Sequence, residues 1–245
     1  MGSRLLLAVI CGMHIENAHQ RLRSLWGRID RQHNELIAAR LTGKRVLDVG
    51  CGYGSLVAYL SERGYAAEGV DYDSEGVDIA KQIFTHARVR QSNAEDLADY
   101  PDHSFDSIVL KDCMHHLVGE GDVQRAFRSF KRVLVPSGRI VILDPNPMLF
   151  LRIARKLISH VDPEAPLECT LRVLEEQSFA VNDVAFYETI GLPLSGGYVG
   201  MRLVPAIDGL ERAVAGLKRI LSAAVNGGYL GKLFCWRYIV QADAP

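Results

Sequence analysis

The 245-residue chain lacks several features that would assign it to a specialised class. It has no apolar run near the roughly 20 residues that a membrane-spanning helix needs. It has no basic excess, because 28 Lys and Arg stand against 29 Asp and Glu for a net charge of -1. Nucleic-acid-binding domains usually carry such an excess, so we expect no nucleic-acid partner. It also contains no internal repeat, and its 48% hydrophobic content is that of an ordinary globular protein.

Cysteines are few and stand at no metal-binding spacing. They number five, an odd count, and no two form a CxxC pair. They are Cys11, Cys51, Cys113, Cys169 and Cys235. We therefore expect reduced thiols, a cytoplasmic location and no metal site, since the histidines also lack ligand spacing.

Residues 5–11 form a short apolar run that follows Arg4 and resembles a stunted signal peptide. Such a core usually spans about 7–15 residues and ends at small residues, whereas Ile10 is large. We expect a packed N-terminal segment, or an extension upstream of a start at Met13.

Strand and helix patterns alternate through the middle of the chain. The apolar runs at residues 45–49, 67–71, 88–91, 105–110 and 139–143 predict buried strands. Helical patterns cover residues 16–41, 55–63, 75–86 and 123–134, with Ser74 as an expected cap and a turn at 136–138. This rhythm predicts a parallel sheet with helices on both faces, and ligands bind such sheets at the carboxyl ends of the strands. The first and fourth strands should flank the point where strand order reverses.

The C-terminal third is less regular. Helices are expected at 148–160, 167–177 and 210–225, strands at 181–187 and 233–240, and a Gly/Pro-rich loop at 191–205. We expect a helical cap over residues 1–41 and a second domain over 42–245 with insertions at about 146–166 and 190–231.

The sequence Asp48-Val49-Gly50-Cys51-Gly52-Tyr53-Gly54 lies between the first strand and its helix. Glycines there let a ligand approach bare backbone, and free amides at the helix start suit a carboxylate. The GxGxG spacing differs from the GxGxxG of dinucleotide-binding turns. Asp48 would repel a pyrophosphate but could hold an ammonium group.

Two further segments follow neighbouring strands. Asp71 ends the second strand, where a carboxylate can accept both hydroxyls of a ribose. Its alternative role is a surface acid or helix cap. Residues 93–97 follow the third strand, where an adenine edge could meet a side-chain amide and a backbone N–H.

Together these motifs resemble class I S-adenosylmethionine (SAM)-dependent methyltransferases, in particular the small-molecule branch called type 11. The resemblance covers about residues 44–145 and includes residues 46–54, 69–73, 93–106, 114–117 and 132–139. It implies a Rossmann-like, mostly parallel seven-stranded sheet with helices on both faces, an N-terminal helical cap and a helical insertion before the last strand. Two positions depart from the family pattern, with Asn93 in place of Asp and Ser137 in place of Gly.

The resemblance also implies which residues hold the cofactor SAM. The methionine part would lie against the turn, and Lys111 would border the sulfonium through its backbone. Ribose would lie at the second strand's end and adenine at the segment after the third. The implied set is Asp48, Gly50, Cys51, Gly52, Gly54, Asp71, Tyr72, Asn93, Ala94, Glu95 and Lys111.

Methyl transfer is an in-line displacement, for which a protein mainly positions the acceptor. A base is needed only for a protonated acceptor. The candidates are His115 and His116, although neither has a visible orienting partner in the sequence and His116 matches a family position that is often structural. The acceptor is expected to be a small molecule, hydrophobic or lipid-like, and residues 148–160 are a candidate peripheral membrane contact. Alternatives are an NAD-dependent oxidoreductase on the same scaffold and a non-catalytic SAM-binding module.

Overall fold

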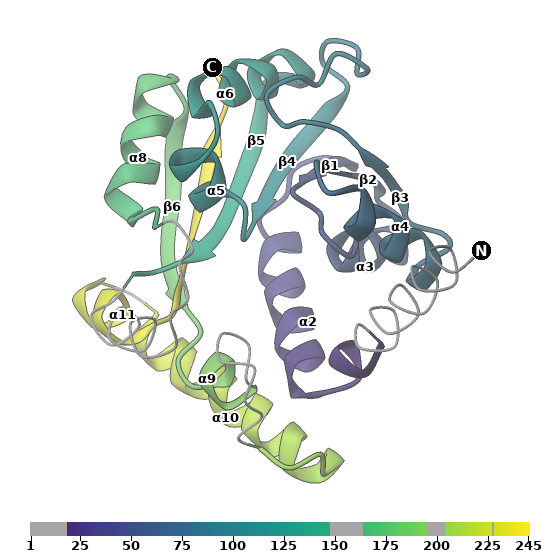
Figure 1. The fold of residues 1–245 in the computed structure, drawn as a ribbon. Coiled ribbons are helices and arrows are strands. Elements are labelled where there is room, and N and C mark those ends of the chain that lie inside the picture. The colour runs from purple at the N-terminus through teal and green to yellow at the C-terminus, as the bar shows by residue number, and fades with distance from the viewer. Residues whose placement is uncertain (1–18, 148–163, 196–203, 227) are drawn as a thin grey trace.

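The computed structural model describes residues 19–147, 164–195, 204–226 and 228–245 (Figure 1). One seven-stranded sheet has the strand order β3-β2-β1-β4-β5-β7-β6. Strand β7 alone runs opposite to the other six strands. The strands are β1 Arg45–Val49, β2 Ala66–Asp71, β3 Arg88–Gln91, β4 Phe105–Lys111, β5 Leu134–Pro145, β6 Ala180–Tyr187 and β7 Arg237–Asp243. The predicted fold class is therefore confirmed, and the strand order reverses between β1 and β4 as expected.

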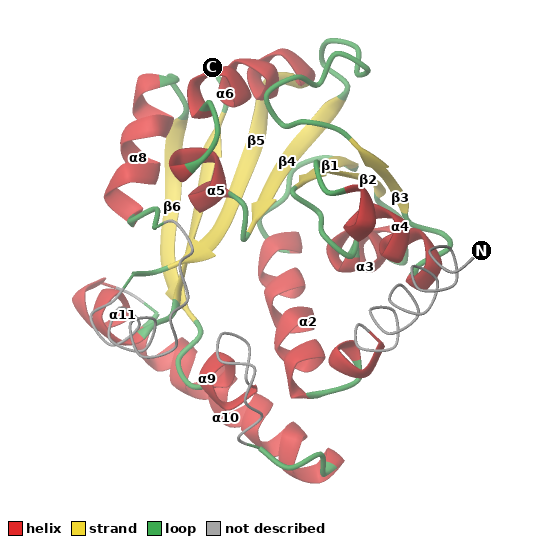
Figure 2. Cartoon of the chain, in the orientation of Figure 1, coloured by secondary structure: helices red, strands yellow, loops and turns green. Residues whose placement is uncertain are grey.

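Helices cover both faces of the sheet (Figure 2). Successive residues of a strand point to opposite faces, so Leu47 joins one core and Val46 the other. The first core is closed by α5 Met114–Gly119, α6 Val123–Val133 and α8 Leu167–Glu176. The second is closed by α2 Leu25–Ala38, α3 Ser55–Ser61 and α4 Ser74–Ile83. Burial on both faces explains why the strand sequences are continuously apolar.

Further helices lie beyond the carboxyl ends of β5 and β6 (Figure 1). They are α9 Gly191–Ser195, α10 Asp208–Val225 and α11 Gly228–Phe234. Helix α2 contacts α9 and α10, and α11 packs against β6 and α10. Among the described residues, no helix has both the length and the apolar character to cross a membrane.

Several predicted boundaries were wrong for identifiable reasons. The helix expected over 16–41 is interrupted in its described part, because the Ser24 hydroxyl accepts the amide of Trp26 and starts α2 there. Asp73, not Ser74, caps α4 by accepting the amides of Glu75 and Gly76. The turn at 136–138 is a bulge within β5, where Ser137 has a positive φ of 58°.

Other errors concern helices that the sequence patterns did not indicate. Helix α5 follows β4 directly, and α9 occupies part of the expected Gly/Pro-rich loop. Helix α11 occupies residues expected to begin the last strand, which starts at Arg237. The helix expected over 148–160 lies outside the described residues.

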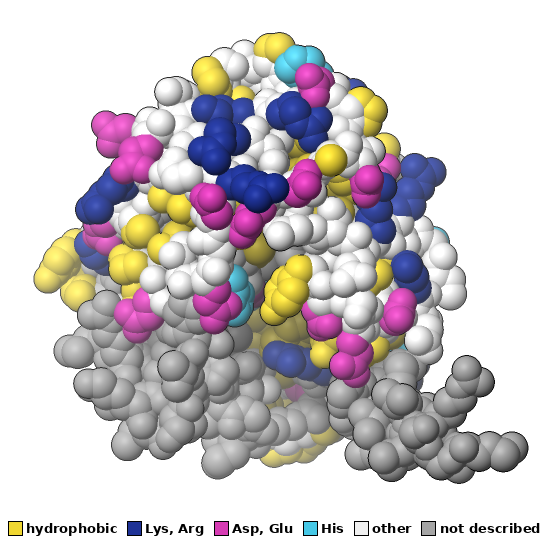
Figure 3. All heavy atoms as spheres, turned by 45° about the horizontal axis from the view of Figure 1, so that its top comes forward, with side chains coloured by type: hydrophobic (Ala, Val, Ile, Leu, Met, Phe, Trp, Pro, Cys, Tyr) yellow, Lys and Arg dark blue, Asp and Glu magenta, His cyan; other side chains and the backbone are white. Residues whose placement is uncertain are grey.

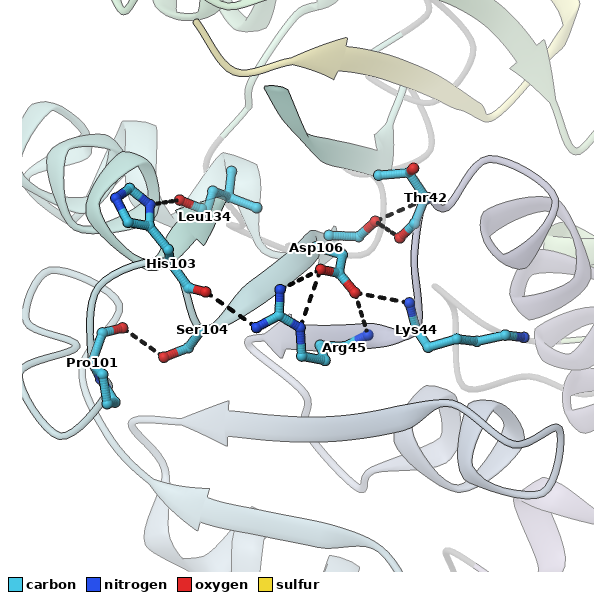
Figure 4. A network of polar contacts seen from close by, with 9 residues as sticks. Thr42, Lys44, Arg45, Pro101, His103, Ser104, Asp106 and Leu134 are labelled. Carbon is cyan, nitrogen blue, oxygen red and sulfur yellow. Dashed lines mark hydrogen bonds and ion pairs between the residues drawn. The ribbon is translucent and has the colours of Figure 1, made fainter. Parts of the chain in front are cut away.

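Basic and acidic side chains are interspersed on the face seen when the top of the molecule in Figure 1 is turned towards the viewer (Figure 3). A network of polar contacts lies at the amino ends of β1 and β4, where the Asp106 carboxylate accepts the amides of Lys44 and Arg45 at 2.9 Å and pairs with the Arg45 guanidinium (Figure 4). The Ser107 hydroxyl donates to the Thr42 carbonyl at 2.8 Å. Asp106, part of the family-like segment, therefore fixes β4 beside β1 at the edge opposite their carboxyl ends.

Candidate functional site

A cleft of about 660 Å³ opens at the carboxyl ends of β1, β2 and β4. This is the edge where strand order reverses, which is where ligands bind in open parallel sheets. Eleven of the thirteen predicted site residues line it: Asp48, Gly50, Cys51, Gly52, Asp71, Tyr72, Asn93, Ala94, Glu95, Lys111 and His116. Gly54 and His115 do not line it.

The three glycines of the turn all have positive φ, but each for a different reason. A Cβ on Gly50 would lie 2.6 Å from the Cys113 Sγ, so β4 and the turn could not approach as closely. A Cβ on Gly54 would meet Ala80 and Val89 at 3.3 Å, which assigns Gly54 to packing. No heavy atom lies within 4 Å of the position that a Cβ on Gly52 would occupy, so a ligand can approach this side of its backbone.

Asp71 orders the loops on both sides of the cleft. Its Oδ2 accepts the Gly52 amide at 2.8 Å, and its Oδ1 accepts the Asp73 amide at 3.0 Å. Each carboxylate oxygen retains a second lone-pair position for a ligand hydroxyl. Tyr72, beside it, is 77% exposed at the rim of the cleft.

The segment after β3 forms the opposite wall. The Asn93 side-chain oxygen accepts the Glu95 amide at 2.9 Å, which holds a tight turn. Ala94 lies in that turn and lines the cleft. The Glu95 carboxylate accepts the Asp122 amide at 2.8 Å and so ties this wall to the start of α6.

Charged side chains form the floor of the cleft. Asp48 is buried, and among the described residues its Oδ1 has no hydrogen-bond partner. Burial raises the pKa of Asp48 to about 7, although the Lys111 ammonium opposes this shift. The Lys111 Nζ donates to Asp30 Oδ1 at 2.5 Å and to Asn34 Oδ1 at 2.7 Å. At neutral pH the floor therefore holds the partly protonated carboxyl group of Asp48 beside the Lys111 ammonium, whose charge is balanced by Asp30.

The N-terminal helices close one side of the cleft, as the expected cap would, but the sequence did not single out the residues that do so. Arg21, Trp26 and Asp30 line it, and the Arg21 guanidinium lies 4.3 Å from the Trp26 ring centroid. Asp30 and Asn34 are one helical turn apart, which brings both to Lys111. The i, i+4 spacing of Asp30 and Asn34 indicates a polar face on the helix, but their partner Lys111 is too distant in the sequence to be predicted.

His115 and His116 differ in environment. His115 is buried, and its Nδ1 lies 2.9 Å from Asp144 Oδ1 at the end of β5. Its ring centroid lies 4.3 Å from that of His116, which lines the cleft. His116 pairs with the exposed Glu120 at 3.4 Å. The orienting partner that the sequence did not reveal is therefore Asp144, and burial raises the pKa of its carboxyl group.

A second buried polar cluster lies on another face of α2. Glu188 Oε2 is 2.9 Å from Lys218 Nζ and 3.2 Å from His33 Nε2. Burial lowers the pKa of His33 to about 4. Burial alone would raise the pKa of Glu188, but its hydrogen bond with His33 and the charge of Lys218 lower it to about 2. Helix α2 is thus bound to the cleft floor on one side and to β6 and α10 on another.

Comparison with known proteins identifies the domain around this cleft. Residues 47–142 match the family model described as a methyltransferase domain. Over these residues the chain is similar to type 11 methyltransferase domains. The recognition made from the glycine turn is confirmed, and the domain contains every predicted site residue.

Relatives extend the similarity over this methyltransferase domain. A ubiquinone biosynthesis O-methyltransferase of Alkalilimnicola ehrlichii is 29% identical over 117 residues, which cover 45% of this chain and 46% of that protein. A fatty-acid O-methyltransferase of Mycolicibacterium smegmatis is 32% identical over 123 residues, 49% of this chain and 43% of that protein. The chain spans about half the length of the curated relatives it matches.

Solved structures support the fold over a larger part of the chain. A SAM-dependent methyltransferase of Archaeoglobus fulgidus has a TM-score of 0.60 at 22% identity, with 94% of each chain covered. Geranyl diphosphate C-methyltransferase of Streptomyces coelicolor, in complex with geranyl diphosphate and S-adenosyl-L-homocysteine, has a TM-score of 0.61 at 16% identity. That alignment covers 90% of this chain and 81% of that one.

Proposed function

We propose that the protein transfers a methyl group from S-adenosylmethionine to a small-molecule acceptor. The observation that carries this proposal is the Asp71 carboxylate bound to the Gly52 amide at the mouth of a cleft whose backbone is open there. The methyltransferase domain and the methyltransferase names of its relatives support it.

The cleft residues fit the cofactor, which supplies an electrophilic methyl group on a sulfonium. Asp48 has a buried oxygen that no described residue contacts by a hydrogen bond, which suits an ammonium group. Asp71 would accept ribose hydroxyls, with Tyr72 at the rim, and Asn93, Ala94 and Glu95 would border adenine. Gly50, Cys51, Gly52 and Lys111 would surround the methionine part, while Gly54 would act through packing.

We further propose that His116 removes the acceptor's proton where the acceptor is a hydroxyl, because His116 lines the cleft and His115 does not. The bound cofactor would supply the methyl group, and the His116 ring would take the proton that the acceptor oxygen loses as it is methylated. Glu120, 3.4 Å from His116 Nδ1, would stabilise the resulting imidazolium. The buried His115, which is held by Asp144 at 2.9 Å and whose ring centroid lies 4.3 Å from that of His116, would position the His116 ring.

A hydrophobic or lipid-like acceptor belongs to the proposal. The relatives include a fatty-acid O-methyltransferase and a ubiquinone biosynthesis O-methyltransferase, which supports an acceptor with an apolar chain. The acceptor would lie beside the insertions at 146–166 and 190–231, which are described only in part, with residues 1–41 as a cap. A cytoplasmic location also belongs to the proposal, and the free thiols of the described cysteines Cys51, Cys113, Cys169 and Cys235 support it. The membrane contact proposed for 148–160 lies outside the described residues.

This function is tested by incubating the protein with radiolabelled SAM and, in separate reactions, a long-chain fatty acid, a lipid-tailed phenol or a prenyl diphosphate. Label should pass to at least one of these acceptors. The variant Glu120→Gln should bind S-adenosylhomocysteine normally but shift the pH profile of transfer to a hydroxyl acceptor, which a merely structural pair would not do. Binding of SAM without transfer to any acceptor would favour a non-catalytic module, and binding of NAD instead would favour an oxidoreductase.

A further inference from the structure

Helix α10 buries two charged residues, Glu211 and Lys218, and exposes several large apolar ones. Its buried residues are Glu211, Ala215, Lys218 and Ser222, which follow one another at helical spacing and face α2 and β6. Its exposed side carries Leu210, Leu217, Ile220 and Leu221. An ordinary surface helix has the reverse arrangement. The apolar residues exposed on α10 therefore indicate a surface that could contact an apolar partner.

The exposed apolar surface continues onto α11. Nine of the thirteen large hydrophobic side chains that are exposed in the described residues lie between Ile207 and Phe234. On α11 they are Tyr229, Leu230, Leu233 and Phe234, at 44–75% exposure. Soluble monomers rarely expose contiguous apolar patches of more than a few hundred Å². Aromatic residues such as Tyr229 are common where a protein meets the headgroup layer of a bilayer.

The exposed charges that the two helices themselves carry are mainly basic. Between 208 and 234 the exposed charged residues are one acid, Asp208, and three bases, Arg212, Arg219 and Lys232. Each base is in a surface ion pair, with Asp208, Glu35 and Glu168 respectively. Exposed pairs of this kind contribute about 0–1 kcal/mol, so the cations can exchange partners with lipid phosphates. Helix α10 has 18 residues, about 27 Å in length, and lies at the periphery of the molecule (Figure 1).

We propose that the exposed side of α10 and α11 is a docking surface for a lipid bilayer that contains anionic phospholipids. The apolar side chains would enter the boundary between headgroups and acyl chains, and the three cations would contact phosphates. This surface lies on the elements that cover the carboxyl edge of β6, so docking would bring that end of the molecule to the membrane. The inference does not depend on the proposed methyl transfer.

Co-sedimentation with vesicles of phosphatidylcholine and phosphatidylglycerol tests it. The natural chain should sediment with the vesicles, and the double variant L217E/I220E should lower the partition coefficient at least about tenfold. The matched control V181E/V184E adds the same charges at exposed residues of β6 and should sediment like the natural chain. Both variants should unfold in urea at the same midpoint as the natural chain, which shows that they are folded.

Three results would overturn the docking surface. The first is no sedimentation of the natural chain with vesicles. The second is sedimentation that L217E/I220E leaves unchanged. The third is a dimer of the natural chain that does not bind vesicles and that L217E/I220E converts to a monomer, which would assign this face to a second copy of the chain.

Discussion

The carboxylate of Asp71 accepts a hydrogen bond from the backbone N–H of Gly52 at 2.8 Å. Its other oxygen accepts the Asp73 amide, so one side chain fixes the glycine turn after β1 and the loop after β2. The residue proposed to hold the ribose therefore also shapes the loop proposed to hold the methionine part. Cofactor binding and loop geometry should fail together when this carboxylate is removed.

We expect Asp71→Ala to weaken binding of S-adenosylhomocysteine about 100-fold or more in a calorimetric titration. Hydrogen bonds to a charged group contribute about 1.5–3 kcal/mol each, and this change removes two to the backbone as well as those to the ligand. Asp99→Ala, which removes an exposed carboxylate outside the cleft, serves as the control. Equal affinity in the Asp71 variant and the natural chain would contradict the assignment.

Gly52 and Gly64 provide a matched pair of glycines. Both have positive φ and open space within 4 Å of the point that a Cβ would occupy, but Gly64 follows α3, away from the cleft. Gly52→Ala and Gly64→Ala should each lower the free energy of unfolding by about 1 kcal/mol in urea titrations. Only Gly52→Ala should also weaken S-adenosylhomocysteine binding, because its methyl group enters the ligand's space. A similar loss of affinity in both variants would show that the effect is strain alone.

Asp48 should release a proton when the cofactor binds. Burial raises its pKa to about 7, so a substantial fraction of the free protein carries a protonated Asp48 near pH 6.5. A bound ammonium group lowers that pKa, and the carboxyl group ionises. Calorimetry in buffers of different ionisation enthalpy at that pH should detect the released proton, and Asp48→Asn should not release it. Equal proton release by the variant would assign the titration to another group.

His33 should make stability depend on pH. Its pKa is lowered from 6.5 to about 4 in the fold, so between these values the unfolded chain binds more protons than the folded one. Its contribution is fully present above pH 6.5 and is lost as the pH falls towards 4, by up to about 3 kcal/mol.

Urea unfolding of the natural chain and of His33→Asn at pH 7 and pH 4.5 measures this contribution. The natural chain should lose more stability over that interval, and the opposing contribution of Asp48 is common to both proteins. Equal losses would mean that folding does not lower the pKa of His33.

The sequence predicted the parts of the site that are local. The glycine turn, Asp71 and residues 93–95 each follow a strand that apolar runs identify, and strand ends in a parallel sheet converge. Contacts between distant residues could not be predicted in this way. Lys111 and Asp30 are 81 positions apart, and His115 and Asp144 are 29 apart, so their pairing depends on sheet register and on how α2 packs. The last two residues of α11, Leu233 and Phe234, were expected to begin a strand because apolar residues in so short a segment fit either pattern.

The most direct test of the account is a calorimetric titration of the natural chain with S-adenosylhomocysteine and, separately, with NAD. We expect one S-adenosylhomocysteine per chain and no binding of NAD, because Asp48 and the GxGxG spacing disfavour a pyrophosphate. Binding of NAD without binding of S-adenosylhomocysteine would contradict the central claim that this cleft is a SAM site.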